Sequence, residues 1–230
     1  MLPSDASRAL IFDLDGTLID SVIDLAQALN VLLAERHRPA VRLAQVKGFV
    51  GDGALKLVER AFAATGGPDA LDTLPALTQR FIAIYESIPA TPAQLYPDVA
   101  TVLAGLRQTG LRLGLCTNKP QSATEKLLPQ LGLGDLFDAV VGGDALPVRK
   151  PAPAHLQAVI DRLGIANDRA IMIGDNDNDA AVARGCGVPF IAMLYGYPRV
   201  PVAELGAAAL LERFAELPGA INCIWGESIA

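Results

Sequence analysis

Residues 8–17 read RALIFDLDGT, an apolar run that ends in two aspartates, a glycine and a threonine. The run from Arg8 to Phe12 is continuous rather than alternating, which is typical of a parallel strand buried on both faces. Side chains at a strand end point to opposite sides until the chain turns, and Gly16 permits a sharp turn. We therefore expect Asp13 and Asp15 to face one pocket at the carboxyl end of this strand.

Further apolar runs of the same kind follow, and helical stretches separate them. The expected strands are Leu111 to Cys116, Asp138 to Val141, Ala170 to Ile173 and Phe190 to Leu194. The expected helices are Val99 to Thr109, Ser122 to Leu131, Ala154 to Leu163 and Asp179 to Gly185. Strands that alternate with helices are typical of an open α/β fold. We therefore predict a doubly wound, mostly parallel, Rossmann-like sheet as the core.

A long insertion separates the first strand from the second, and residues 21–92 show helical patterns only. Asp20 or Ser21 is placed to cap a first helix that ends near Pro39 and shows one apolar face. That face carries Leu25, Leu29, Leu32 and Leu33. Two more helices are expected, from Ala54 to Ala64 and from Leu71 to Ser87, before a proline-rich return at 88–92.

The position of this insertion divides the chain into two units. An insertion that follows a strand lies above the carboxyl edge of the sheet, where ligands bind in such folds. We predict an α/β catalytic core formed by residues 1–20 and 93–230, and an all-helical cap domain formed by residues 21–92 that contributes substrate specificity. The segment from Pro218 to Ala230 carries no clear pattern.

Composition limits the classes of function. Hydrophobic residues make up 51% of the 230 residues and charged residues 19%, which supplies a core and argues against disorder. A net charge of -6 without a basic stripe disfavours nucleic acid as a partner. No run reaches the roughly 18 apolar residues of a membrane helix, and no signal peptide is evident. The sequence carries no signal for an oligomeric state.

The cysteines and histidines do not form a metal site in the sequence. Cys116, Cys186 and Cys223 are scattered, which favours free thiols in a reducing compartment. We therefore expect a cytoplasmic protein. The histidines, His37 and His155, fall within helical patterns and are interpreted as surface or helix-end residues.

A second acidic motif, GDNDND at residues 174–179, also follows a predicted strand. Aspartates at alternate positions resemble a calcium-binding EF-hand loop. Such a loop needs glycine at its sixth position and glutamate at its twelfth, where this chain has Ala180 and Cys186. Carboxylates set opposite the first aspartate pair, with no His or Cys beside them, suit Mg2+ rather than Zn2+.

Two further polar sites follow predicted strands. Thr117 and Asn118 come directly after the strand that ends at Cys116, and Lys150 follows a strand and a glycine turn. Taken singly, Thr117 is a turn or helix-cap residue and Lys150 is an exposed lysine. Taken together, four polar sites follow four different strands, and such strand ends meet at one edge of a parallel sheet.

The order of these four sites resembles the haloacid-dehalogenase-like superfamily, whose motifs are DxD, Thr or Ser, Lys, and GDxxxD. The helical insertion is similar to the subgroup with a cap after the first motif. Four segments resemble phosphoglycolate phosphatases: Val50 to Ala54, Thr117 to Pro120, Gly142 to Asp144 and Tyr195 to Tyr197. The resemblance implies a magnesium-dependent hydrolase of small phosphorylated metabolites, with 2-phosphoglycolate as the first candidate.

The resemblance also implies a role for each polar site. Asp13 would attack phosphorus and form an aspartyl phosphate. Asp15 would protonate the leaving alkoxide and then activate water. Thr117, Asn118 and backbone amides would hold the phosphoryl oxygens, and Lys150 would neutralise charge between Asp13 and the phosphate.

The metal ligands follow from the same resemblance. Mg2+ would be bound by Asp13, Asp175 and the main-chain carbonyl of Asp15. Asp179 would orient the metal site or bind through water.

The cap loop formed by Gly51, Asp52 and Gly53 is the expected specificity element, because two glycines allow close approach to a ligand. A carboxylate at Asp52 would repel the carboxylate of phosphoglycolate. Nearby cations could offset this repulsion, namely Lys47, Lys56 and Arg60, or Asp52 could face away. A sugar phosphate and pyrophosphate therefore remain alternative substrates.

Other chemistries of the superfamily fit less well. A dehalogenase lacks the second aspartate, which is present here as Asp15. Mutase relatives carry a histidine about ten residues later, where this chain has Leu25. Phosphonoacetaldehyde hydrolase relatives need a cap lysine for a Schiff base; Lys56 is nearby but reads as a solvated helix residue. A non-catalytic metal- or phosphate-binding module is the alternative of another class, and the intact set of motifs argues against it.

Overall fold

The computed structural model describes residues 8–66, 73–90 and 94–226. Parallel strands form one sheet in the order β3-β2-β1-β4-β5-β6. These strands are β1 (Ala9–Phe12), β2 (Arg112–Cys116), β3 (Ala139–Val141), β4 (Ala170–Gly174), β5 (Phe190–Met193) and β6 (Ala209–Leu211). The predicted parallel α/β sheet is confirmed. The strand order reverses around β1, and such a switch point opens a crevice at the carboxyl ends of the strands.

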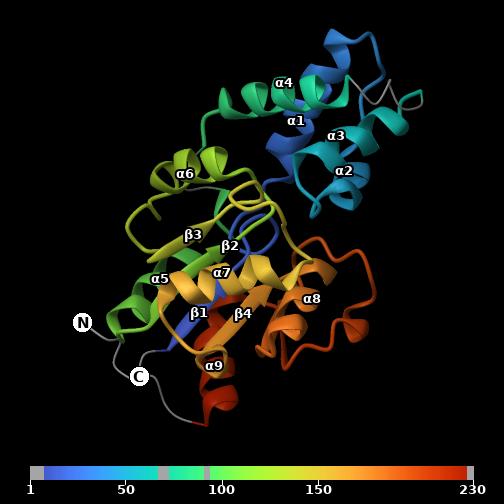
Figure 1. Cartoon of the computed structure of the whole chain (residues 1–230). Helices are drawn as coiled ribbons and strands as arrows, with labels where there is room; N and C mark the ends of the chain where they lie inside the picture. Colours follow the sequence, from blue (N-terminus) through green and yellow to red (C-terminus); the bar gives the residue numbers. More distant parts are fainter. Residues whose placement is uncertain (1–7, 67–72, 91–93, 227–230) are drawn as a thin grey trace.

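Helices cover both faces of the sheet (Figure 1). One face is covered by α5 (Val99–Gln108), α6 (Gln121–Gln130) and α9 (Leu217–Trp225), and the other by α7 (Pro153–Leu163) and α8 (Asp177–Cys186). In β1, Leu10 and Phe12 belong to the first core, while Ala9 and Ile11 belong to the second. This division explains why the strand is continuously apolar.

The inserted segment forms a unit of its own, which we call the four-helix unit. It comprises α1 (Val22–Glu35), α2 (Leu43–Phe49), α3 (Ala54–Ala63) and α4 (Leu74–Glu86). These helices pack around a separate apolar core, which includes the predicted leucine face of α1. Figure 1 shows the unit at the upper right, beyond the edge of the sheet where β1 ends.

The two linkers to the four-helix unit run side by side. Asp20 N donates to Gln94 O over 2.9 Å, and Tyr96 N donates to Leu18 O over 3.0 Å. These bonds join the segment that leaves the sheet to the segment that returns to it.

Several boundaries differ from the sequence-based expectation. Helix α1 ends at Glu35 rather than near Pro39, and α4 begins at Leu74, with the expected start at residue 71 outside the described residues. Helix α2 and strand β6 were not predicted, and the unassigned C-terminal segment contains α9. Across the described parts of the chain, no helix has the length and apolar character needed to cross a bilayer.

Candidate active site

The loop after β1 brings the first acidic motif to the sheet edge. Asp13 N donates to Ile173 O over 2.9 Å, which continues the pairing of β1 with β4, and Asp13 is 5% exposed. The chain then turns at Gly16, whose φ is 91°. A Cβ at Gly16 would lie 2.4 Å from Asp175 Oδ2, so glycine is required for the first and last motifs to meet.

Three buried carboxylates converge at this point. Asp13, Asp175 and Asp179 each offer an oxygen, and these oxygens lie within 4.8 Å of one another. Asp175 accepts hydrogen bonds from Tyr197 N (2.7 Å) and Thr17 Oγ1 (3.1 Å). Such fixed orientation suits a site that holds a cation.

Asp179 is held by the turn that precedes it. Its Oδ2 accepts from Asp175 N (3.1 Å) and Asn176 N (3.2 Å), in the first turn of α8. Its Oδ1 accepts from Lys150 Nζ over 2.7 Å. Both oxygens of Asp179 therefore have partners, which matches an orienting role better than that of a free ligand.

Lys150 reaches the same cluster from the loop after β3. Its Nζ lies 2.8 Å from Asp13 Oδ1, and the residue is 2% exposed. Lys150 is therefore not the exposed lysine that its sequence position, taken singly, would indicate. Burial alone would lower the pKa of Lys150, but the charges of Asp13 and Asp179 outweigh burial and raise it above its ordinary value.

The electrostatics of the cluster fit a divalent cation. Burial raises the pKa of Asp13 to about 7; the charge of Lys150 opposes this shift and that of Asp179 adds to it. Burial and the charges of Asp179 and Asp13 also raise the pKa of Asp175. Asp13 Oδ1 is buried and receives no hydrogen bond of regular geometry from the described residues. The carboxylates of the cluster carry more negative charge than Lys150 can neutralise. Negatively charged oxygen atoms are the ligands that Mg2+ prefers.

The segment after β2 contributes the next polar groups. Thr117 is 1% exposed, and its Oγ1 accepts from Lys119 N over 3.2 Å, which leaves the hydroxyl proton to donate elsewhere. Asn118 Nδ2 donates to Gly51 O (2.8 Å) and Lys150 O (3.0 Å). The Asn118 amide group therefore joins three loops in this structure, whereas the sequence predicted that it holds phosphoryl oxygens.

Lys119 is a residue to which sequence reasoning gave no role. Its Nζ lies 3.1 Å from Asp15 Oδ1 and 2.9 Å from Tyr85 OH, and the residue is 6% exposed. Tyr85 comes from α4 of the four-helix unit. The sequence signal that could have indicated a role for Lys119 is its position directly after Thr117 and Asn118, at the edge of the sheet.

The cap loop meets the core, but Asp52 does not face the cavity. Asp52 Oδ2 accepts from Arg60 Nη2 (2.5 Å) and from Arg199 Nη1, and its Oδ1 accepts from Asn178 Nδ2 (2.8 Å). Burial alone would raise the pKa of Asp52, but hydrogen bonds from these three side chains lower it. Both possibilities raised from the sequence hold: the Asp52 side chain faces away from the cavity, and neighbouring cations offset its charge. Arg199, which also pairs with Asp177, was not anticipated.

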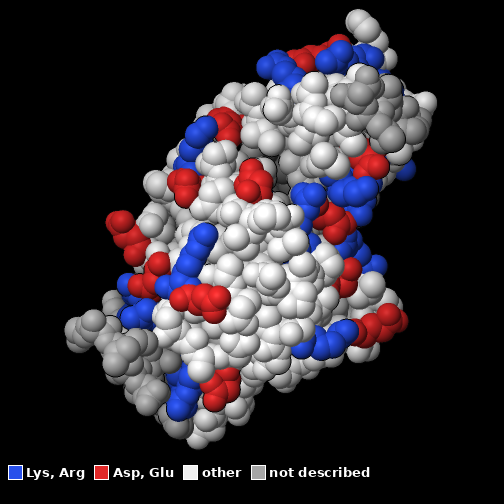
Figure 2. All heavy atoms as spheres, in the orientation of Figure 1, with Lys and Arg blue, Asp and Glu red and all other residues white. Residues whose placement is uncertain are grey.

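Lys47 and Lys56 play no part in this arrangement. Lys47 Nζ lies 5.9 Å from the centroid of the Tyr197 ring, and Lys56 pairs with Glu59 on the surface. A groove beside Asp52 is lined by Lys56, Arg60 and Arg149. Figure 2 shows Lys and Arg side chains gathered at the boundary between the four-helix unit and the sheet, on the right.

A cavity of about 50 Å³ lies between the core and the four-helix unit. Its core side is formed by Asp13, Asp15, Thr117, Asn118, Lys119, Pro120 and Ala123. Its cap side is formed by Leu25, Val50, Gly51, Gly53, Ala54, Leu57, Phe81, Ile82 and Tyr85. The predicted motif residues and both cap glycines thus meet around one small space, while Asp52 lies outside the lining.

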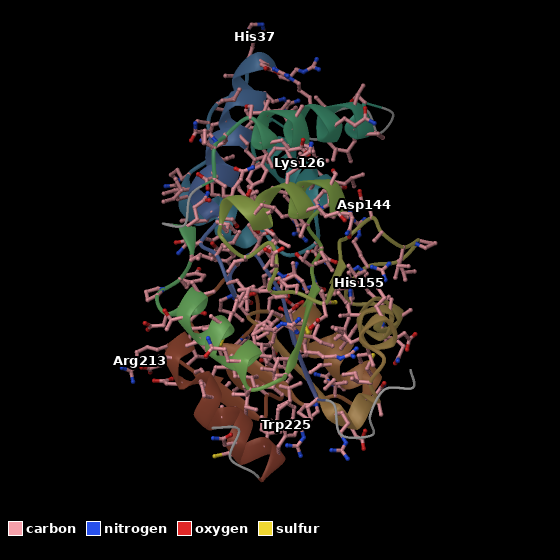
Figure 3. All side chains as sticks on the ribbon, turned by 90° about the vertical axis from the view of Figure 1, so that its left-hand side faces the viewer. His37, Lys126, Asp144, His155, Arg213 and Trp225 are labelled. Carbon is pink, nitrogen blue, oxygen red and sulfur yellow. The ribbon has the colours of Figure 1, made fainter. Side chains whose placement is uncertain are left out.

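Neither histidine is among the residues that line this cavity, and Figure 3 labels both. His37 is exposed at the far tip of the four-helix unit, as expected. His155 lies in the first turn of α7 but is fully buried, so a surface position is wrong for it. Its Nδ1 is 3.4 Å from Cys116 Sγ and its Nε2 is 3.0 Å from Gly142 O. His155 therefore packs behind the loop that carries Lys150.

Comparisons with known proteins show similarity over nearly the whole chain. Residues 7–187 match the family described as haloacid dehalogenase-like hydrolase. The chain is 49% identical over 214 residues to a phosphoglycolate phosphatase of Rhodospirillum rubrum, covering 91% of this chain and 89% of that protein. It is 42% identical over 209 residues to a phosphoglycolate phosphatase of Caulobacter vibrioides, covering 91% and 88%.

A solved structure is similar over the same extent. The crystal structure of a predicted phosphoglycolate phosphatase from Haemophilus somnus 129pt matches with a TM-score of 0.84 at 28% identity, and the match covers 92% of this chain and 96% of that chain. The likeness therefore includes both the sheet and the greater part of the four-helix unit.

Proposed function

This chain belongs to the haloacid dehalogenase-like hydrolase family and hydrolyses phosphate monoesters, and we propose that its substrate is 2-phosphoglycolate. The products would be glycolate and inorganic phosphate. The observation that carries this proposal is the small cavity, in which Asp13 and Lys119 line the same space. Relatives with the phosphoglycolate phosphatase name and high identity over most of the chain support it.

Asp13 is proposed as the nucleophile. One carboxylate oxygen attacks phosphorus, the bond from phosphorus to the ester oxygen breaks, and an aspartyl phosphate forms. Asp13 lines the cavity and its Oδ1 contacts Lys150, so its position supports this role. Splitting hydrolysis into two displacements lowers each barrier, although most of the acceleration must be electrostatic.

Asp15 is proposed as the general acid and base. In the first step it donates a proton to the leaving alkoxide oxygen of glycolate. In the second it takes a proton from the water that attacks the aspartyl phosphate, which frees Asp13 and releases phosphate. Asp15 lines the cavity and is held by Lys119, so its carboxyl group has a defined orientation.

Thr117 and Lys150 are proposed to bind the phosphoryl group. The Thr117 hydroxyl oxygen accepts from Lys119 N, and its own O–H is proposed to donate to a phosphoryl oxygen. Lys150 Nζ cancels part of the repulsion between the carboxylate of Asp13 and an anionic substrate. The Asn118 side chain would act indirectly, by holding Gly51 and the Lys150 loop in place.

Mg2+ is the proposed cofactor. Asp13 and Asp175, with the main-chain carbonyl of Asp15, would hold it, and Asp179 would orient the site. When bound, the ion supplies positive charge that stabilises the phosphoryl oxygens. The cluster of buried carboxylates formed by Asp13, Asp175 and Asp179 supports this assignment.

The four-helix unit is proposed as a cap that closes over the substrate and excludes water. Tyr85 and Gly51 already contact core residues. The cysteines are free thiols, which supports a reducing compartment such as the cytoplasm.

The test is phosphate release from a panel that contains 2-phosphoglycolate, sugar phosphates, pyrophosphate and an aryl phosphate. Each is assayed with Mg2+ and with a chelator, for the wild type and for Asp13→Asn. We expect metal-dependent release that is highest for 2-phosphoglycolate and absent in Asp13→Asn. A higher kcat/KM for a sugar phosphate or pyrophosphate would overturn the substrate assignment, and no release from any ester would favour a non-catalytic module.

A further inference from the structure

We propose that Lys119 binds a second anionic group of the substrate, the carboxylate of a short phosphorylated hydroxy acid, and so determines specificity. This inference rests on the proposed function, because it concerns the substrate of the same site. It assigns the two buried lysines separate tasks. Lys150 faces the nucleophile, and Lys119 faces the remainder of the substrate.

The position of Lys119 separates it from the phosphoryl chemistry. Its Nζ contacts Asp15 and Tyr85, whereas Lys150 Nζ contacts Asp13 and Asp179. Lys119 is also among the residues that line the cavity. A second buried cation beside the general acid is not needed to neutralise the phosphoryl group.

Lys119 retains capacity to bind a ligand. An ammonium group has three N–H donors. Within the described residues, its hydrogen bonds go to the Asp15 carboxyl group, at 3.1 and 3.4 Å, and to Tyr85 OH, at 2.9 Å. Two of these contacts go to the two oxygens of one carboxyl group, so a single N–H shared between them leaves one donor for a substrate carboxylate.

The rest of the cavity suits a short substrate. The small volume, about 50 Å³, favours the two-carbon glycolate group over the larger ring of a sugar phosphate. Leu25, Leu57 and Phe81 form an apolar wall that offers no partner to sugar hydroxyls.

The contact with Tyr85 places this recognition at the boundary with the cap. Tyr85 belongs to α4, its hydroxyl oxygen accepts from Lys119 Nζ, and the ammonium group lies 4.2 Å from the ring centroid. The four-helix unit therefore orients the proposed specificity residue although that residue belongs to the core. Removal of the Tyr85 hydroxyl should weaken recognition and leave the Asp15 contact intact.

The test compares two esters that differ only in the second group. In 2-hydroxyethyl phosphate, a CH2OH group replaces the carboxylate of 2-phosphoglycolate. The measured quantity is the ratio of kcat/KM for 2-phosphoglycolate to that for 2-hydroxyethyl phosphate. We expect Lys119→Met to lower this ratio by about ten- to a hundredfold, mainly through KM, which is the scale of a hydrogen bond to a charged group.

Further variants separate recognition from a structural effect. Lys119→Arg should keep part of the ratio, and Tyr85→Phe should lower it by a smaller factor than Lys119→Met. Lys126→Met is the matched control, because Lys126 is an exposed lysine on α6 that pairs with Glu86 (Figure 3). Thermal unfolding checks that each variant is folded, and if Lys119→Met is not, Tyr85→Phe carries the test.

The outcomes distinguish this inference from the proposed function. Equal losses on both esters, with a shifted pH profile, would make Lys119 only a partner of Asp15 and would overturn the inference. A wild type that hydrolyses other esters but not 2-phosphoglycolate would overturn the proposed function and the inference with it. A ratio that falls only in the Lys119 and Tyr85 variants would support both.

Discussion

Lys150 Nζ lies 2.8 Å from Asp13 Oδ1, so a lysine from the loop after β3 touches the carboxylate that follows β1. The two residues are 137 positions apart in the sequence and both are buried. Asp179 Oδ1 accepts from the same ammonium group over 2.7 Å. This pairing holds the proposed nucleophile in place and partly neutralises it.

Replacement of Lys150 tests this relationship. Lys150→Ala should lower kcat by about a hundredfold or more, because loss of one preorganised charge donor costs about 3 kcal/mol in the barrier. The measurement is kcat at saturating Mg2+, with circular dichroism as the check on folding. Arg149→Ala is the control, since Arg149 is the exposed neighbour. Retention of most activity by Lys150→Ala would remove Lys150 from the site.

Mg2+ affinity should depend on pH. Burial raises the pKa of Asp13 to about 7 and also raises that of Asp175, so protons compete with the ion for these oxygens. The ion-bound form carries fewer protons than the free form, hence affinity increases with pH. Below pH 7 we expect Kd to increase by about tenfold per pH unit for each proton displaced. Calorimetric titration at pH 6, 7 and 8 measures this, and a constant Kd would contradict it.

Asp52→Asn tests the contact between the cap loop and the core. Asp52 binds Arg60 and Arg199 outside the cavity, so loss of its charge should loosen the loop that carries Gly51. We expect KM to rise by about fivefold, on the scale of 1 kcal/mol for a partly exposed ion pair. The rise should be similar for esters with and without a carboxylate.

The control for this variant is Glu59→Gln, which removes the exposed pair with Lys56 on α3 and should leave KM unchanged. Selective improvement of carboxylate-bearing substrates in Asp52→Asn would instead place Asp52 in the cavity.

Gly196→Ala tests the close packing behind Asp175. An added Cβ would lie 2.3 Å from Asp175 Cβ and 2.5 Å from Gly16 O. We expect a loss of about 1–3 kcal/mol in the free energy of unfolding from overpacking, together with weaker Mg2+ binding. Urea denaturation and a metal titration measure the two effects.

Gly105→Ala is the matched substitution, because Gly105 lies within α5 with nothing within 4 Å of its added Cβ. It should raise the free energy of unfolding by about 0.5–1 kcal/mol, since alanine favours a helix interior over glycine. Equal effects of the two substitutions would argue against a packing constraint at Gly196.

The helix and the strand that the sequence did not predict both have weak local patterns of apolar residues. Helix α2 has seven residues, of which only Val46 is buried, so no apolar periodicity marks it. Strand β6 has three residues and is only partly buried. The formation of such short elements depends on the segments that pack against them. Strand β1 is the opposite case, because each of its residues contacts one of two cores and all are apolar.

The sequence by itself determined the sheet, the insertion and the edge at which the four motifs meet. It did so because buried parallel strands require continuous apolar runs, and the residues after such strands lie at one edge. Only the tertiary structure decided where charged side chains point. Asp52 pairs with Arg199 across 147 positions, and Lys119 donates to Tyr85 of the four-helix unit. His155 became a buried residue for the same reason: burial and charge pairing depend on segments that are distant in sequence and adjacent only after packing.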